Sequence, residues 1–395
     1  MSARSVPSNA VTLLVGRIVG AGASIVVVSL AAHRLDQPQF GLAVSVMAAG
    51  FLANTLVTFG TDTVVTRSVA AESGAARSTM TASLQWQLGA AAVLIAMATV
   101  AVLMGADLAI LVQSAALAPL AVVTVMGAAL RGAQRMDQLL VASTTGALTV
   151  LGAAVGLFSV ASEPWVPIAA FAIGSGVTAA ISSWFVRRLL LATGEFRSIR
   201  SLLWETLPFA GMVGLAAVGA QAGLLLVEFL ADETAGGYGA ALRLSEAARL
   251  VPAALMGAVF PALVAGLERD HRYQRWLRLM LGYAVVATLG LVVLAQPLNR
   301  LMFDSQPDGA ALIRLLSLGL VLTVFRLALS FELIAANRES TVLVSAVIGA
   351  LATVVGGVVL VGPFGARGVA VAQLVGLGLV VGWLMVNRVG EMADR

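Results

Sequence analysis

Twelve long apolar runs constrain this chain more than any other feature of its sequence. They lie at roughly 9–32, 40–61, 82–104, 106–130, 137–160, 165–186, 207–231, 238–266, 277–296, 311–334, 340–361 and 366–387. A helix needs about 20 apolar residues to cross the hydrocarbon core of a bilayer. The longest segments between runs, 62–81 and 187–206, are too short for a soluble catalytic domain. We therefore expect an all-α polytopic membrane protein with about 12 transmembrane helices.

Composition excludes several other classes of protein. Hydrophobic residues make up 59% of the chain and charged residues 11%, whereas soluble domains average about 45–50% and about 25%. The absence of Cys excludes a disulfide scaffold, a Cys zinc site and a Cys nucleophile. With only two His, we expect no metal or other cofactor, and no catalytic residue is assigned. The net charge of +4 is scattered among apolar runs, so no nucleic-acid partner is expected.

Arginine placement predicts the orientation in the membrane. With the N-terminus inside, the inner loops hold Arg67, Arg77, Arg131, Arg135, Arg187, Arg188, Arg197 and Arg200 among others, and the outer loops hold Arg34, Arg300 and Arg367. Basic residues accumulate in cytoplasmic loops. We therefore expect both termini to be cytoplasmic.

An internal repeat relates the two halves of the chain. The segment 135–148 matches 338–351 at a constant offset of 203, from Arg135 and Arg338 at one end to Gly146 and Gly349 near the other. Chance is the alternative explanation, since small apolar residues are abundant. Each half holds six runs, which predicts two pseudo-symmetric six-helix bundles, 1–200 and 201–395, around a central cavity. Gly-x-x-x-Gly spacings, such as those starting at Gly16 and Gly152, predict close helix contacts.

Ionisable side chains inside the apolar runs are the candidate functional residues. Arg17 lies in the first run, and Arg243, Glu246 and Arg249 lie in the eighth. Residues three apart on a helix drift by only about 60° per step, so the last three share one broad face. Charges at membrane depth are costly and face protein or water. We expect Arg17, Arg243 and Arg249 to line the cavity and bind a polyanion such as a pyrophosphate, whose oxygens match the guanidinium fork.

A purely structural role is the alternative for several of these charges. Glu228 and Arg243 would then form one local ion pair, and Arg326 and Glu332 another. Asp62, near Arg67, would be a solvated helix end. Glu228 and Glu246 are the candidates either for ion coupling or for ion pairs.

Several passages resemble a known family. Phe40-Gly41 opens the second run, which leads to Phe59-Gly60-Thr61-Asp62; Leu130-Arg131-Gly132 precedes the fifth run, and residues 362–370 form a Gly-rich turn into the last. Together with the number of runs and the repeat, these passages resemble the polysaccharide flippases, including O-antigen flippases, of the multidrug/oligosaccharidyl-lipid/polysaccharide exporter superfamily. No single motif is diagnostic, and the resemblance rests on the whole set.

The resemblance implies a transporter and not an enzyme. Such a protein would move undecaprenyl-pyrophosphate-linked oligosaccharide from the inner to the outer leaflet of the bacterial cytoplasmic membrane, for lipopolysaccharide or another surface polysaccharide. Its partners would be the lipid-linked anionic oligosaccharide, membrane lipid and a glycan polymerase of the same pathway.

Three other functions stay open. An ion-coupled drug antiporter of the same superfamily would need an acid at mid-membrane depth, for which Glu246 is the best candidate. A glycan polymerase or ligase would need a long outer loop, and the stretch 297–310, with Arg300, Asp304 and Asp308, is short. A membrane scaffold would not need arginine inside its helices.

Overall fold

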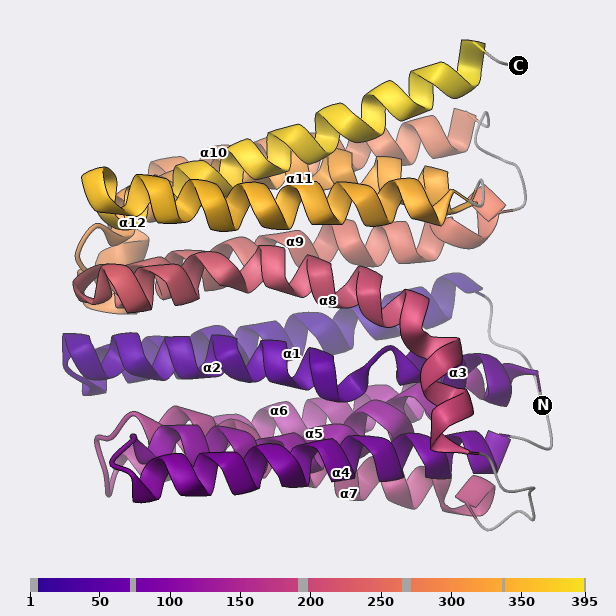
Figure 1. Ribbon diagram of the computed structural model, residues 1–395, viewed down its shortest axis with the longest axis horizontal. Coiled ribbons are helices and arrows are strands. Elements are labelled where there is room, and N and C mark those ends of the chain that lie inside the picture. Colours follow the sequence, from indigo (N-terminus) through magenta and orange to yellow (C-terminus); the bar gives the residue numbers. More distant parts are fainter. Residues whose placement is uncertain (1–5, 72–75, 191–197, 265–270, 336–337, 394–395) are drawn as a thin grey trace. The chain divides into compact units, whose positions relative to one another are not determined.

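The computed structural model describes residues 6–71, 76–190, 198–264, 271–335 and 338–393, and every regular element in them is a helix (Figure 1). The helices are α1 (Val6–Arg34), α2 (Gln37–Thr58), α3 (Thr61–Ala70), α4 (Ala76–Leu103), α5 (Leu108–Gly132), α6 (Met136–Phe158), α7 (Trp165–Leu190), α8 (Ile199–Leu230), a 3-10 turn η1 (Asp232–Thr234), α9 (Ala235–Val264), α10 (His271–Phe303), α11 (Gly309–Ala335) and α12 (Glu339–Ala393). The expectation of an all-α chain is confirmed.

Ten of these helices are long and apolar enough to cross a membrane. One of them, within α12, is a 49-residue stretch that corresponds to the last two expected spans. Gly365 interrupts it with φ 56° and ψ −143°, and the chain doubles back there (Figure 1). The described part of α9 carries Arg243, Glu246 and Arg249, and α9 is not among the ten. Each of the twelve expected runs thus coincides with a helix or with one arm of α12.

The turn between α4 and α5 separates the two least clearly divided runs. Gly105 has φ 100°, which a residue without Cβ adopts at little cost. Asp107 then accepts a hydrogen bond from the Ala109 backbone N–H at 2.7 Å and caps α5. A short turn containing Gly105 and the N-cap residue Asp107 is therefore enough to reverse the direction of the chain between α4 and α5.

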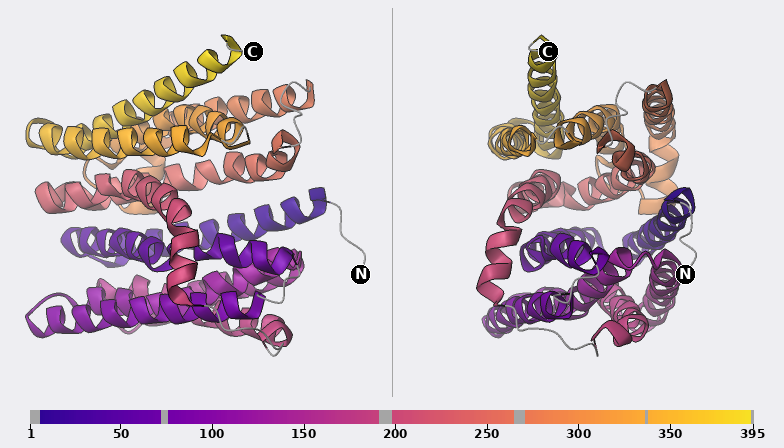
Figure 2. Two further views of the ribbon diagram at one scale, coloured as in Figure 1. Left: turned by 45° about the vertical axis from the view of Figure 1, so that its right-hand side comes forward. Right: turned by 90° about the vertical axis from the view of Figure 1, so that its right-hand side faces the viewer.

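Contacts divide the chain into two compact units. The first comprises Met1–Leu35 and Val46–Ala217, and the second comprises Asp36–Ser45 and Val218–Arg395. Within each unit long helices pack side by side, as the end-on view in Figure 2 shows. The expected division at 200/201 into bundles around a cavity stays a proposal.

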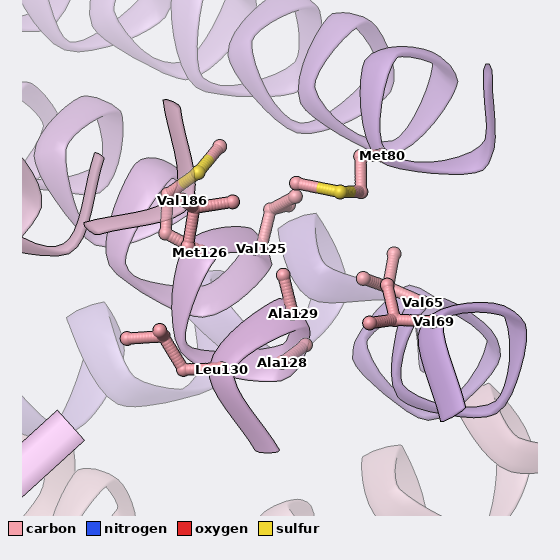
Figure 3. Close-up of a cluster of buried hydrophobic side chains, with 9 residues drawn as sticks. All are labelled: Val65, Val69, Met80, Val125, Met126, Ala128, Ala129, Leu130 and Val186. Carbon is pink, nitrogen blue, oxygen red and sulfur yellow. The ribbon is translucent and has the colours of Figure 1, made fainter. Parts of the chain in front are cut away.

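The short helix α3 was not expected from the apolar runs, and it completes the core of the first unit. It places Val65 and Val69 against Met80 of α4 and against α5 (Figure 3). The close approach depends on Gly132, where a Cβ would lie 2.6 Å from the Thr66 carbonyl oxygen. Because only ten residues are involved, α3 has the length of a connecting helix and not of a span.

The internal repeat has matched backbone contacts in both units. The Arg135 N–H donates to the Leu130 carbonyl at 2.9 Å, and the Arg338 N–H donates to the Leu333 carbonyl at 2.9 Å. Each arginine side chain also contacts a neighbouring helix near its end. Nη1 of Arg135 donates to the Phe185 carbonyl at 3.4 Å, and Nη1 of Arg338 donates to the Asn387 carbonyl at 3.1 Å. The offset of 203 therefore marks equivalent turns.

Glycines mark equivalent helix contacts in the two units. A Cβ on Gly174 would lie 2.8 Å from the Gly146 carbonyl oxygen, and one on Gly376 would lie 3.1 Å from the Gly349 carbonyl oxygen. Among described atoms, by contrast, nothing lies within 4 Å of a Cβ built on Gly152. The Gly-x-x-x-Gly prediction was therefore wrong at that site, since the close contact falls on Gly146 instead.

Candidate functional site

The charged face of α9 lies in the second unit. Arg243 and Glu246, one turn apart, form an ion pair with 2.9 Å between Nη1 and Oε2. Their side chains are 17% and 31% exposed, so water screens this pair only in part. The shared face expected from the spacing is therefore present, and its first two members neutralise each other.

The other oxygen of Glu246 is also engaged. Gln221 of α8 donates from Nε2 to Oε1 of Glu246 at 2.9 Å. The carboxylate thus accepts hydrogen bonds from two different helices, α8 and α9, and is held in a fixed orientation.

Arg249 lies one turn farther along the same helix. Its Nε atom is buried and donates no hydrogen bond within the described part of the chain. Its electrostatic neighbours are Glu246 and Tyr238. Tyr238 is fully buried, and its hydroxyl donates to Oε1 of Gln373 in α12 at 2.9 Å, which joins α9 to α12.

The structure adds Arg326 of α11, which the sequence analysis had assigned to an ion pair with Glu332. Its Nε is also buried and without a hydrogen-bond partner among the described residues. Arg249 is a like-charged neighbour of Arg326. Glu332 instead lies 2.9 Å from Nε of Arg388. Six residues turn an α-helix by about 600°, which places positions 326 and 332 on different faces. Counting helical positions would have argued against the pairing of Arg326 with Glu332.

Glu228 of α8 has a different environment. Oε2 accepts a hydrogen bond from the Ser45 hydroxyl at 2.8 Å. Arg243, the expected partner of Glu228, forms an ion pair with Glu246. Arg243 therefore does form a local ion pair, as the structural alternative expected, but its partner is Glu246 and not Glu228.

Arg17 lies in the first unit, on α1, and is exposed. It is a like-charged neighbour of Arg131 on α5, whose Nη2 lies 3.4 Å from Oδ2 of Asp62 on α3. Arg67, expected near Asp62, instead stacks its guanidinium 4.9 Å from the centre of the Phe209 ring. Asp62 is therefore paired and does not simply end a solvated helix.

The sequence carries the profile of a known family. The family described as "Polysaccharide biosynthesis protein" matches residues 6–266, well over half of the chain. The chain belongs to this family. The family resemblance drawn from the sequence is thereby confirmed, and the chain is a multi-pass membrane protein of this family.

Solved structures share the fold over nearly the whole chain. The crystal structure of MATE in the bent conformation is 16% identical, with 99% of this chain and 96% of that chain covered and a TM-score of 0.65. The lipid II flippase MurJ in an inward closed conformation is 13% identical, with 96% and 87% covered and a TM-score of 0.68. A MOP superfamily transporter from Pyrococcus furiosus is 15% identical, with 99% and 97% covered and a TM-score of 0.68. A comparison with curated proteins gave no match.

Proposed function

We propose that the protein is a flippase that moves a lipid-linked oligosaccharide with an anionic pyrophosphate head, of the undecaprenyl type, from the inner to the outer leaflet by alternating access. Membership in the polysaccharide biosynthesis family supports a role in surface glycan assembly. The observation that carries the proposal is the set of arginines inside long apolar helices. Such residues are expensive in a membrane and commonly mark substrate pathways.

The proposed substrate-binding residues are Arg17, Arg243 and Arg249. Among the described residues Nε of Arg249 has no hydrogen-bond partner, and Arg17 is exposed, so both have donors for an incoming phosphate oxygen. Arg243 already donates to Glu246 and would contribute through its remaining donors. The proposed setting is the bacterial cytoplasmic membrane with both termini inside, and the proposed partner is a glycan polymerase that takes the flipped product.

Deletion of the gene tests this function. We expect lipid-linked repeat units to accumulate on the cytoplasmic leaflet and surface glycan to fall. Complementation with Arg17→Ala, Arg243→Ala or Arg249→Ala should restore less surface glycan than wild type at equal membrane abundance. Arg278→Ala, which removes an exposed arginine of α10, is the matched control. Unchanged glycan without accumulated intermediate in the deletion strain would contradict the proposal.

An ion-coupled drug antiporter is the second candidate, because MATE proteins share the fold. Glu246 is the acid it would use. Both oxygens of Glu246 already accept hydrogen bonds from Arg243 and Gln221, which favours a structural carboxylate. Drug-dependent proton release by reconstituted protein, abolished in Glu246→Gln, would favour the antiporter. Glycan polymerisation by the purified protein would favour an enzyme instead.

A further inference from the structure

The first part of α8, residues 199–207 (the entry segment), precedes the membrane span of that helix. The span covers Phe209–Leu230, and at 1.5 Å per residue its 22 residues measure about 33 Å, enough to cross the hydrocarbon core. The entry segment therefore lies at the membrane boundary. It runs across the axis of α4, which is itself a candidate span of the first unit (Figure 1). A helix in this position lies roughly parallel to the membrane plane.

One face of the entry segment is fixed to the first unit. Leu202 and Thr206, one turn apart, are fully buried. Leu202 packs with Val64 of α3 and Ala82 of α4. The segment therefore has a defined rotation about its own axis, and its other faces are directed away from these helices.

The other residues of the entry segment divide into an apolar face with an arginine and a polar face. Successive residues of an α-helix are about 100° apart, which places Arg200, Trp204 and Leu207 within about 60° of one another. The side chains of Trp204 and Leu207 are 67% and 47% exposed, and Arg200 is exposed as well. Ser201 and Glu205, both exposed, lie about 110° from this group. Three faces thus meet three surroundings: protein, an apolar partner and water.

The apolar face has the chemistry of the boundary between acyl chains and lipid headgroups. An indole and a leucine are favourable there, whereas they are unfavourable in water. Arg200 lies in the first turn of α8, where the helix dipole disfavours a positive charge. Arg67 of α3 is also exposed, and its guanidinium lies 4.9 Å from the centre of the Phe209 ring, at the start of the span. Lipid phosphodiesters would supply the complementary negative charge, and their oxygens fit the guanidinium fork.

We propose that the entry segment of α8 is a docking surface for anionic phospholipid. Trp204 and Leu207 enter the upper part of the acyl chains, Arg200 and Arg67 bind phosphodiester headgroups, and the polar face remains in water. This surface goes beyond the flippase function, because its ligand is the lipid of the membrane itself and none of its residues belongs to the proposed substrate site.

The position of the entry segment is tested in the full-length protein, reconstituted in lipid vesicles. Because the chain has no Cys, Leu207→Cys and Ser201→Cys each provide a single attachment site for a fluorophore. We expect nitroxide-labelled lipid to quench the label at 207, and iodide, present on both sides of the membrane, to quench the label at 201. A label at 207 that iodide quenches and lipid does not would overturn the proposal and favour a protein partner for this face.

Recognition of the lipid charge is tested with the same label at 207. Nitroxide-labelled phosphatidylglycerol and phosphatidylcholine are compared at equal mole fraction in phosphatidylcholine vesicles at low salt. One arginine near an anionic lipid surface strengthens binding about fivefold. We therefore expect phosphatidylglycerol to quench as if enriched at least about fivefold around the label, and high salt to reduce this enrichment.

Variants assign the enrichment to the two arginines. Arg200→Gln should lower it about fivefold, and Arg67→Gln should lower it as well. Arg200→Lys, which keeps the charge, should retain most of it. Arg278→Gln, an exposed substitution on α10, is the matched control and should leave it unchanged.

Two results would contradict charge recognition by this surface: equal quenching by the two lipids without the arginine substitutions, and an undiminished enrichment in both Arg200→Gln and Arg67→Gln. Neither depends on the flippase proposal, because the vesicles contain no lipid-linked oligosaccharide. A protein that fails the transport test would still select anionic lipid here.

Discussion

Glu246 shares a single negative charge between Arg243, to which it is hydrogen bonded, and Arg249, its electrostatic neighbour. Glu246→Gln keeps the shape of the side chain and removes that charge. We expect the free energy of unfolding to fall by about 1–3 kcal/mol, between the values for exposed and for buried ion pairs. Chemical unfolding in detergent measures the change.

The double variant Arg243→Gln with Glu246→Gln is the control for this prediction. Removing both members of the pair leaves less uncompensated charge than removing the carboxylate alone, so it should be more stable than Glu246→Gln. A Glu246→Gln protein as stable as wild type would show that the ion pair contributes nothing.

The sequence showed which charged residues lie inside the apolar runs, but not how they pair. Spacing along one helix correctly grouped Arg243, Glu246 and Arg249. It did not show that Gln221 of α8 would hold the second oxygen of Glu246, because the packing of α8 on α9 is a tertiary contact. Arg326 was missed for the same reason, since its neighbour Arg249 lies on another helix.

At the scale of elements, the α6–α7 contact depends on Gly174. A Cβ there would lie 2.2 Å from Cγ2 of Val150 and 2.8 Å from a backbone oxygen. Gly174→Ala should therefore lower the free energy of unfolding by about 1–3 kcal/mol through overpacking. Gly176→Ala is the matched control, because no described atom lies within 4 Å of a Cβ built there, and it should be neutral or stabilising by up to about 1 kcal/mol. Equal unfolding midpoints for the two variants would contradict the packing argument.

The junction between α2 and α3 depends on Gly60 in the left-handed region, with φ 69°. A Cβ would also lie 2.9 Å from Cβ of Phe209. Gly60→Ala should lose about 1–2 kcal/mol from backbone strain plus a similar amount from packing. Gly105→Ala, at φ 100° with open space around it, should show the strain alone. Thermal unfolding of both variants separates the strain from the packing cost. A smaller loss of unfolding free energy in Gly60→Ala than in Gly105→Ala would contradict this prediction.

Element positions were largely predictable because a span must be apolar over a fixed length. The turn at Gly105 and Asp107 needed only local chemistry. The short helix α3 was not predicted, since its buried residues Val65 and Val69 cover only one face and leave no continuous apolar run. A close contact was correctly predicted at Gly16, where a Cβ would lie 3.2 Å from Oγ of Ser143. The contacts at Gly146 and Gly174 were missed, because a Gly-x-x-x-Gly spacing says nothing of what lies opposite.

At the scale of the whole molecule, the chain without cysteine allows a direct test of orientation. Ser162, in the loop before α7, and Ser198, at the start of α8, are both exposed. Arginine placement predicts that Ser162→Cys faces the outside and Ser198→Cys the cytoplasm. A membrane-impermeant maleimide applied to intact cells should label Ser162→Cys and spare Ser198→Cys until the membrane is opened.

The reverse labelling pattern would invert the predicted topology, with both termini outside. Labelling of both sites in intact cells would show that 163–197 does not cross the membrane completely. The cysteine-free wild type supplies the background in the same cells.

The composition of the two compact units restricts how the chain can be divided. Asp36–Ser45 belongs to the second unit although it lies early in the sequence, and the residues of α8 up to Ala217 belong to the first. A polypeptide cut after residue 200 would therefore leave each fragment without a segment that completes its own unit. Descent from a duplicated half-length ancestor would then require that the two copies became mutually dependent after fusion. Separately synthesised fragments should assemble only when both are inserted into the same membrane.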